Sequence, residues 1–339
     1  MNDSARPLLC LSASDVEATG LDMAEAIETV SQVLAMHARG QVNLPSKVIL
    51  DMDERRHGRI NAMPAHVRGG IDACGIKWIA GFPGNPARHG LPRASAVVIL
   101  NDTETGIPQC IMEASRISAL RTGAVTGVGA RHLARPGATN AGIIGAGVQS
   151  RTQIEALRTV LTDLAEVRVF DVRREAVERF VAWAADRHHG LRVAVADTAE
   201  DAVRGADCVV TATVADEPIV RAAWLKEGVL FAHVGSYQEE EEQVILQADK
   251  IVVDVWEEVL HRRTPLLARM HEAGTIDRTR IHADIGEIIL GDKPGRETDD
   301  ERIFFSPLGL GSEDIAVAAA VYRRATEMGL GVRVPFGSA

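Results

Sequence analysis

The sequence predicts an α/β protein in which a doubly wound parallel sheet is joined to an α+β lobe. Three observations predict this fold class. Apolar strand-like runs alternate with helical segments from Asn140 onwards, which is typical of a parallel sheet with crossover helices. A glycine-rich turn separates the first of these strands from the helix that follows it. Before Asn140, strand-like segments follow one another with turns between them, which favours a second sheet in a separate lobe.

The first lobe is expected to begin with helices and to continue as a sheet. An amphipathic helix is predicted over 23–37, because four apolar residues share one of its faces. Turn clusters then separate four segments of strand character, at 47–50, 59–64, 74–79 and 95–100. A long helix-like stretch over 111–133 leads to a linker rich in proline and glycine.

The second half alternates regularly between strands and helices. Six strands are predicted, at 141–144, 167–170, 192–195, 207–212, 229–234 and 250–253. A last helix is predicted from about Glu313 to Met328, and we expect it to pack back on the first lobe. The predicted domains are therefore 1–120 with 315–339, and 121–314.

Composition and charge limit the kinds of molecule that the protein is expected to bind. The chain carries 37 Lys and Arg against 47 Asp and Glu, a net charge of −10. Without a basic stretch, this balance argues against nucleic acid or an anionic membrane as the main partner. The four cysteines are scattered and no apolar run reaches membrane-spanning length, so we expect a cytoplasmic protein with reduced thiols. No His, Cys and Asp cluster has the spacing of metal ligands, and no metal is expected.

The turn after the first strand of the second domain carries a dinucleotide-binding fingerprint of the Rossmann type. It reads Gly145-Ala-Gly-Val-Gln-Ser150, and the next strand ends at Asp171. The glycines permit a tight turn and close approach to a pyrophosphate, and the helix N-terminus offers free N–H groups. Asp171 is placed to bind an adenosine ribose, which favours NAD, whereas Arg173 and Arg174 can accept the 2′-phosphate of NADP. The alternative is a glycine-rich turn that binds nothing.

Polar residues also follow two later strands of this domain. Thr211 and Thr213 end the fourth strand, and His233 with the segment to Tyr237 ends the fifth. The carboxyl ends of parallel strands face the ligand crevice, so these residues are expected to meet a ribose, a nicotinamide or a substrate. His233 can equally be a core histidine. The acidic run 239–242 is predicted to be a helix N-terminus.

Three basic residues of the first lobe are candidates for binding a carboxylate. Lys77 interrupts an apolar strand-like run, Arg121 lies on the long helix, and Lys47 belongs to an earlier strand-like segment. Lys and Arg bind carboxylates through charge-assisted hydrogen bonds, so two or three converging cations would hold an amino or keto acid. The alternative for each residue is a solvated surface charge.

With these residues the chain resembles the ornithine cyclodeaminase/μ-crystallin family over nearly its whole length. The matching landmarks are Gly75-Ile-Lys-Trp78, Leu120-Arg-Thr-Gly123, the turn 145–150 and Gly309-Leu-Gly-Ser-Glu-Asp314. The resemblance implies a first lobe that binds substrate and forms a homodimer, a Rossmann domain and a returning C-terminal helix.

The family's site residues are carried over by these landmarks. Lys77 and Arg121 match positions that hold the substrate carboxylate and are the predicted catalytic residues. The predicted substrate-binding residues are Lys47, Asn61, Lys77, Arg121 and Asp314. The predicted cofactor-binding residues are Thr122, Gly145, Ala146, Gly147, Val148, Gln149, Asp171, Arg173, Thr211, Thr213, Gly235 and Ser236.

Within the family, residues 76–95 are most similar to the branch of N-(2-amino-2-carboxyethyl)-glutamate dehydrogenase. The predicted activity is an NAD(P)-dependent oxidation at the C–N bond of an amino acid or N-substituted amino acid, through an imine. Lys77, among apolar neighbours and near another cation, is the predicted proton-transfer group. Two alternatives are a cyclodeaminase with catalytic NAD and a non-enzymatic NADPH- and ligand-binding protein like μ-crystallin. Two departures from the family pattern count against a cyclodeaminase. The segment Gly235-Ser-Tyr237 lacks the Asp that cyclodeaminases carry there, and Asn61 lies near the position of their ornithine-contacting Glu.

Overall fold

The computed structural model describes residues 7–52 and 58–336 and has the predicted α/β class. It divides into two compact units. The first unit comprises Met1–Arg121 and Leu310–Ala339, and the second comprises Thr122–Gly309. No helix in the described ranges has the length and apolar character needed to cross a membrane.

The first unit contains a mixed sheet and a few helices. Its helices are α1 (Ala13–Ala18), α2 (Met23–Ala38), α3 (Asn85–His89), the beginning of α4 (Ser115–Leu133) and α12 (Gly311–Met328). Its strands are β1 (Pro7–Leu11), β2 (Val42–Asn43), β3 (Val48–Asp51), β4 (Arg59–Val67), β5 (Ala73–Gly81), β6 (Ala94–Asn101), β7 (Pro108–Glu113) and β16 (Val332–Pro335). The strands are ordered β16-β1-β7-β6-β5-β4-β2, and β3 also pairs with β4.

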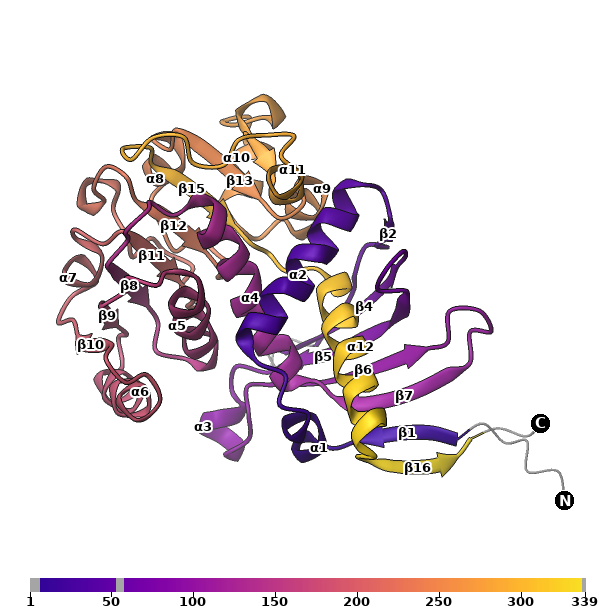
Figure 1. Cartoon of the computed structure of the whole chain (residues 1–339). Coiled ribbons are helices and arrows are strands. Elements are labelled where there is room, and N and C mark those ends of the chain that lie inside the picture. The colour runs from indigo at the N-terminus through magenta and orange to yellow at the C-terminus, as the bar shows by residue number, and fades with distance from the viewer. Residues whose placement is uncertain (1–6, 53–57, 337–339) are drawn as a thin grey trace, which may run out of the picture. The chain divides into compact units, whose positions relative to one another are not determined.

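One face of this sheet is covered by helices. Helix α12 packs against β4, β5 and β6, and α2 packs against α12 (Figure 1). Strand alternation places Lys77 in one row with the buried Val98 and Met112. The neighbouring Trp78 points to the opposite face, where its side chain is 44% exposed. The sheet therefore buries the lysine and exposes the tryptophan.

Local sequence explains why the helices of this unit begin where they do. Asp22 caps α2: its carboxylate accepts the N–H of Glu25 at 2.9 Å, and the Glu25 carboxylate accepts the N–H of Asp22 at 3.1 Å. Such a reciprocal capping box satisfies two N–H groups that the helix leaves without partners. The apolar stripe of α2, including Ile27 and Val30, is fully buried, as its periodicity predicts.

The second unit is a parallel sheet with helices. Its strands are β8 (Asn140–Ile144), β9 (Glu166–Phe170), β10 (Arg192–Val195), β11 (Cys208–Thr211), β12 (Leu230–His233), β13 (Lys250–Val253), β14 (Ala283–Asp284) and β15 (Ile303–Ser306). Its helices are α5 (Val148–Val160), α6 (Arg174–Arg187), α7 (Ala199–Val203), α8 (Glu242–Leu246), α9 (Trp256–Arg262), α10 (Leu266–Glu272) and α11 (Ile285–Leu290), with the remainder of α4 and two short 3₁₀ turns, Ala222–Trp224 and Arg278–Arg280.

The strand order of this sheet reverses at β8. The order is β10-β9-β8-β11-β12-β15-β13-β14, and every pairing in it is parallel. The crevice outside the carboxyl ends of strands at such a reversal is where open α/β sheets bind ligands. The turn after β8 begins at this point.

Several predicted elements differ from the observed ones. The stretch predicted as helix over 111–133 begins as strand β7, and α4 starts only at Ser115, because Cys110 and Met112 alternate into the core of the sheet. Strands β1, β2, β14, β15 and β16 lie outside all the predicted strands. β15 inserts between β12 and β13, although it is only four residues long. Lys47 precedes β3 instead of lying on it.

Candidate active site

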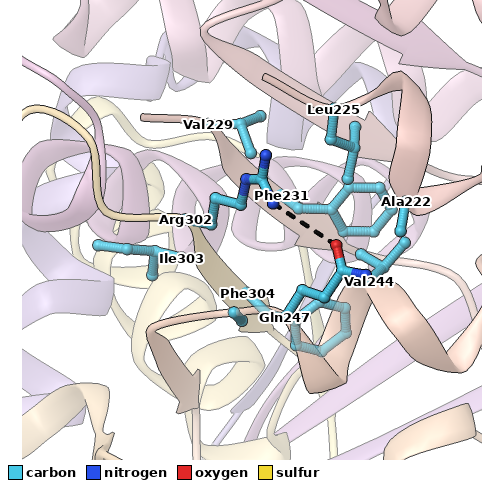
Figure 2. A pocket seen from close by; sticks show the side chains of 10 residues that line it. Ala222, Leu225, Val229, Phe231, Val244, Gln247, Arg302, Ile303 and Phe304 are labelled. Atoms are coloured by element: carbon cyan, nitrogen blue, oxygen red, sulfur yellow. Dashed lines mark hydrogen bonds between the residues drawn. The ribbon is translucent and has the colours of Figure 1, made fainter. Parts of the chain in front are cut away.

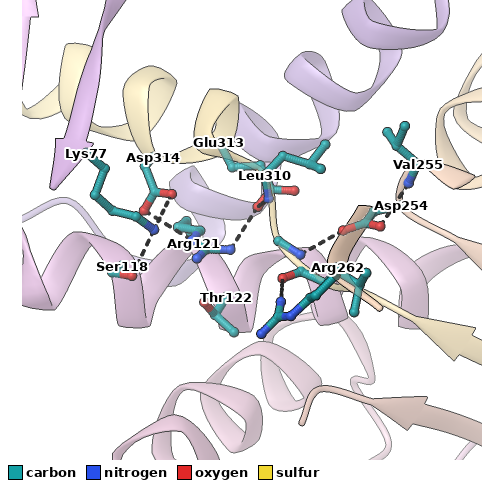
Figure 3. Close-up of polar contacts among 12 residues, drawn as sticks. Lys77, Ser118, Arg121, Thr122, Asp254, Val255, Arg262, Leu310, Glu313 and Asp314 are labelled. Carbon is teal, nitrogen blue, oxygen red and sulfur yellow. Dashed lines mark hydrogen bonds and ion pairs between the residues drawn. The ribbon is translucent and has the colours of Figure 1, made fainter. Parts of the chain in front are cut away.

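A buried cluster of four charged side chains lies in the first unit. Lys77 of β5 donates to Oδ2 of Asp314 at 2.6 Å and to the Ser118 hydroxyl at 3.3 Å. Arg121 of α4 donates from Nε to Oδ1 of Asp314 at 3.1 Å and from Nη1 to Glu313 at 3.1 Å. Figure 3 shows Asp314 between the two cations. Both predicted catalytic residues are thus brought together, and neither is a solvated surface charge: Lys77 is 1% and Arg121 7% exposed.

The electrostatics of this cluster favour proton transfer at Lys77. Burial, and then the neighbouring Arg121, lower the pKa of Lys77 to about 8, although Asp314 and Glu313 oppose this. Burial also disfavours the charge of Arg121, but Asp314 and Glu313 outweigh burial and raise its pKa. Lys77 can therefore change its protonation state near neutral pH while Arg121 stays charged.

Helix α12 supplies both acids from its first turn. Glu313 accepts the N–H of Leu310, the N-cap, at 3.1 Å, which anchors its carboxylate at the helix start. Acidic residues are stabilised at helix N-termini, where N–H groups lack partners. Glu313 and Asp314 are fully buried. The sequence predicts a substrate role for Asp314 but none for Glu313, because nothing local distinguishes Glu313 from a solvated acid at a helix start.

Of the two other predicted substrate residues, Asn61 lies on the same sheet as Lys77 and Lys47 lies just before strand β3. Asn61 of β4 pairs with Ile79, two residues beyond Lys77, and so it lies on the Lys77 face of the sheet. Lys47 is half-buried and stands just before β3.

The turn after β8 has the geometry of a phosphate-binding loop. Gly145 adopts a φ of +103°, and a Cβ at this position would lie 2.7 Å from the carbonyl oxygen of Ala212. Only glycine fits there without strain. Ser150 donates its hydroxyl to the Gly145 carbonyl at 2.7 Å and so fixes the turn. Gly147 is the N-cap of α5, and this residue provides no side-chain cap for the N–H groups of the helix start. Those groups can receive an anion.

Asp171 lies beside this turn at the end of β9. Its Oδ2 accepts the N–H of Ala146 at 2.9 Å, and its Oδ1 accepts the N–H of Arg173 at 2.9 Å. The Asp171 side chain is mostly buried, whereas that of Arg173 is 71% exposed. Val148 and Gln149, also predicted to bind the cofactor, form the first turn of α5.

Two predicted residues near the later strand ends are held by internal contacts: Thr213 donates to Glu239, and Ser236 bonds to Arg262, which also donates to the carbonyl of Leu308 at 2.9 Å. The hydroxyl of Thr211 is buried and has no hydrogen-bond partner among the described residues. Gly235 follows β12 directly, and the Thr122 carbonyl accepts a bond from Gln153 at 3.3 Å.

His233 is the core histidine of the two alternatives. It is 1% exposed, and its Nδ1 lies 2.8 Å from Oε2 of Glu240. Burial alone would lower the pKa of His233, but Glu240 and then Glu239 outweigh it and raise that pKa. The acidic run is only partly a helix start, because α8 begins at Glu242 while Glu239 and Glu240 turn into the interior.

A small apolar pocket elsewhere in the second unit is not a substrate site. It is lined by side chains of β12, β15 and α8 and by residues such as Leu225 (Figure 2). Its volume of about 10 Å³ is enough for roughly one water molecule. In residues 7–52 and 58–336, no three His, Cys, Asp or Glu side chains are grouped to hold a metal ion.

Comparisons with known proteins agree with this geometry. The model of the "Ornithine cyclodeaminase/mu-crystallin family" matches residues 8–329. The alanine dehydrogenase of Archaeoglobus fulgidus is 39% identical over 331 residues, 97% of this chain and 98% of that protein. The N-((2S)-2-amino-2-carboxyethyl)-L-glutamate dehydrogenase of Staphylococcus aureus is 34% identical over 330 residues, 96% of this chain and 98% of that protein.

Two solved structures share the fold along the chain. The Thermococcus litoralis Delta(1)-pyrroline-2-carboxylate reductase, in complex with NADH and L-proline, has a TM-score of 0.89 at 34% identity and covers 96% of this chain and 100% of that one. An archaeal alanine dehydrogenase dimer with bound NAD has a TM-score of 0.88 at 37% identity and covers 98% and 100%. The predicted resemblance is confirmed.

Proposed function

The chain belongs to the ornithine cyclodeaminase/mu-crystallin family, and we propose that it is an NAD-dependent oxidoreductase acting on the C–N bond of an amino acid. The observation that carries this proposal is the buried pair of Lys77 and Arg121, which share one carboxylate, Asp314. Two desolvated cations side by side are suited to hold the carboxylate of a small substrate.

The second unit fits the dinucleotide. The turn at Gly145 and the uncapped start of α5 can receive the pyrophosphate, and Asp171 stands beside that turn to accept hydrogen bonds from the ribose hydroxyls. Bound NAD would supply the acceptor, and NADH the donor, of a hydride. Asp171 favours NAD, because its negative charge would repel a 2′-phosphate.

The residues of the first unit orient the substrate and move a proton. Lys77 and Arg121 hold the α-carboxylate, and this fixed orientation presents the Cα hydrogen for removal as hydride. The Cα–N bond then becomes an imine, and water adds to its carbon. Neutral Lys77 takes one proton from this water and passes it to the nitrogen. As the C–N bond breaks and the C=O bond forms, Lys77 takes up the remaining hydroxyl proton, which is released to solvent with the products. The products are an amine or ammonia, a 2-oxo acid and the reduced nucleotide.

The roles of the remaining predicted residues are assigned on this basis. Each carboxylate oxygen of Asp314 bonds to one of the two cations, so Asp314 fixes Lys77 and Arg121 relative to each other. Glu313 bonds to Arg121 alone and helps to hold its guanidinium in place. Asn61, on the Lys77 face of the sheet, is the residue we assign to the substrate side chain. We assign Lys47 as a further contact of the substrate carboxylate.

A substrate screen tests the proposal. Purified protein would be incubated with NAD and L-alanine, N-(2-amino-2-carboxyethyl)-L-glutamate or L-proline, with NADH absorbance as the readout. The same screen would run in reverse with amine and 2-oxo acid pairs. We expect turnover with an N-substituted or simple α-amino acid. Conversion of L-ornithine to proline without net NADH would instead identify a cyclodeaminase, and binding of NADH without any turnover would identify a binding protein.

We also propose that the chain forms a homodimer through the exposed face of the first sheet. Val48, Trp78 and Val97 lie in one row across β3, β4, β5 and β6, and all three are exposed apolar side chains. An apolar row of this kind is typical of an interface, and the archaeal relative with bound NAD is a dimer. Trp78→Glu should give a monomer in analytical ultracentrifugation, whereas Leu246→Glu, at an exposed site of the second unit, should leave the dimer intact.

A cytoplasmic location is part of the proposal, in keeping with four free cysteines.

A further inference from the structure

One buried carboxylate joins two loops of the second unit. Glu239 lies between β12 and α8 and is fully buried. Its Oε1 accepts the backbone N–H of Thr213 at 2.5 Å and also bonds to the hydroxyl of that threonine. Thr213 follows β11, so the carboxylate fixes the chain where it leaves this strand. The Thr213 oxygen in turn accepts the N–H of Ala215 at 3.1 Å, which extends the fixed segment by one turn.

The same carboxylate occupies the space beside Gly235, in the loop that follows β12. A Cβ built at Gly235 would lie 1.7 Å from Oε2 and 2.3 Å from Cδ of Glu239. No side chain can enter that space while Glu239 stays in place. Gly235 is therefore required by contact with the acid and not by its own backbone angles.

The buried side chains of His233 and Glu240 lie next to Glu239. Oε2 of Glu239 lies 3.7 Å from Nδ1 of His233, which bonds at 2.8 Å to Glu240. All three side chains are at most 1% exposed. Rearrangement of Glu239 would be costly, because its Oε1 would lose the bonds to Thr213 in a buried site, and the contact between His233 and Glu240 leaves little space behind it.

We propose that Glu239 is a positioning residue for the bound dinucleotide: it fixes the loops after β11 and β12 at the carboxyl edge of the sheet, where the nucleotide binds. The inference rests on the proposed function, since it requires NAD to bind at this edge. Glu239 does not itself touch the ligand. It determines where Thr213 and Gly235 stand.

The test measures NADH affinity by fluorescence, together with substrate KM and thermal stability. Glu239→Ala removes both contacts and releases the loops after β11 and β12, so we expect the Kd for NADH to rise roughly tenfold or more. Glu239→Gln keeps an acceptor for the Thr213 N–H and should restore most of the affinity. The substrate KM at saturating NADH should change little. Glu242→Ala, an exposed acid of the same run, is the matched control and should leave the Kd unchanged.

A double-mutant cycle tests the steric contact separately. Gly235→Ala should weaken NADH binding in the presence of Glu239, but it should add nothing further in a Glu239→Ala background, where the space is open. Additive effects, or an unchanged Kd in folded Glu239→Ala, would overturn the inference. If Glu239→Ala does not fold, Glu239→Asp withdraws the carboxylate from both loops and is measured in its place. Wild-type protein that binds no NADH would refute the proposed function and this inference together, whereas NADH binding with failed coupling would refute the inference alone.

Discussion

Each unit buries a cluster of charged side chains, and the two clusters differ in their balance of charge. The first-unit cluster pairs two cations, Lys77 and Arg121, with two acids of α12. The second-unit cluster pairs two acids, Glu239 and Glu240, with His233, and the nearby Arg262 acts against the raised pKa of that histidine. Burial raises the pKa of Glu240, and the neighbouring Glu239 adds to this, although His233 opposes it. The first arrangement suits a site in which fixed acids hold two cations for a substrate carboxylate, and the second suits a fixed support.

The largest expected effect tests the first cluster at Lys77. Lys77→Ala removes a carboxylate contact and the proton-transfer group, so kcat/KM should fall on the order of a thousandfold or more while the Kd for NADH stays the same. Lys77→Arg keeps the positive charge but cannot give up its proton at neutral pH. It should therefore restore substrate binding and not kcat. Equal turnover in wild type and Lys77→Ala would refute the assignment; melting temperatures show whether either variant is unfolded.

A smaller effect is expected at Arg121, whose role is geometric. Arg121→Lys keeps the charge but loses the planar fork that bonds to Asp314 and Glu313 at once. We expect the substrate KM to rise by roughly tenfold to a hundredfold, with a smaller change in kcat. Steady-state kinetics at saturating NAD would measure this split. A loss confined to kcat would contradict a clamping role.

A similar contrast exists beside the nucleotide turn, where the Asp171 side chain is mostly buried and the Arg173 side chain is exposed. Asp171→Ala should raise the Kd for NADH by about tenfold, since a ribose contact and the bond to the Ala146 N–H are both lost. Arg173→Ala is the control, because that side chain is 71% exposed and should matter only for NADPH. A variant at Arg173 with the larger loss of NADH affinity would reverse the assignment.

The smallest expected effect is a displaced pH profile. Lys77 must be neutral to accept a proton, so kcat/KM for oxidation should rise as the pH passes through about 8. Asp314 raises the pKa of Lys77, whereas burial and Arg121 lower it. Asp314→Asn should therefore move the rise to lower pH. Glu313→Gln, which acts on Lys77 through charge alone, should move it less in the same direction. An unmoved midpoint in Asp314→Asn would exclude Lys77 as the titrating group.

Local sequence patterns are sufficient to predict much of the fold and the nucleotide-binding turn. The alternation of strands and helices, the turn at Gly145 and the acid at Asp171 are all signals carried by neighbours in sequence. The partners of Lys77 and Arg121 were not predictable in this way, because Asp314 lies 237 and 193 residues away from them. Neither was the inward turn of Glu239, since an acidic run normally predicts a solvated surface.

Strand β5 carries Lys77 and Trp78 as consecutive residues on opposite faces of one sheet. Because side chains alternate with a period of two, an insertion or deletion of a single residue in the β4–β5 hairpin would exchange the two faces. The lysine would move into solvent and the indole would enter the space beside Asp314. We therefore expect natural length variation in this hairpin to be confined to its connecting turn, near Gly69 and Gly70.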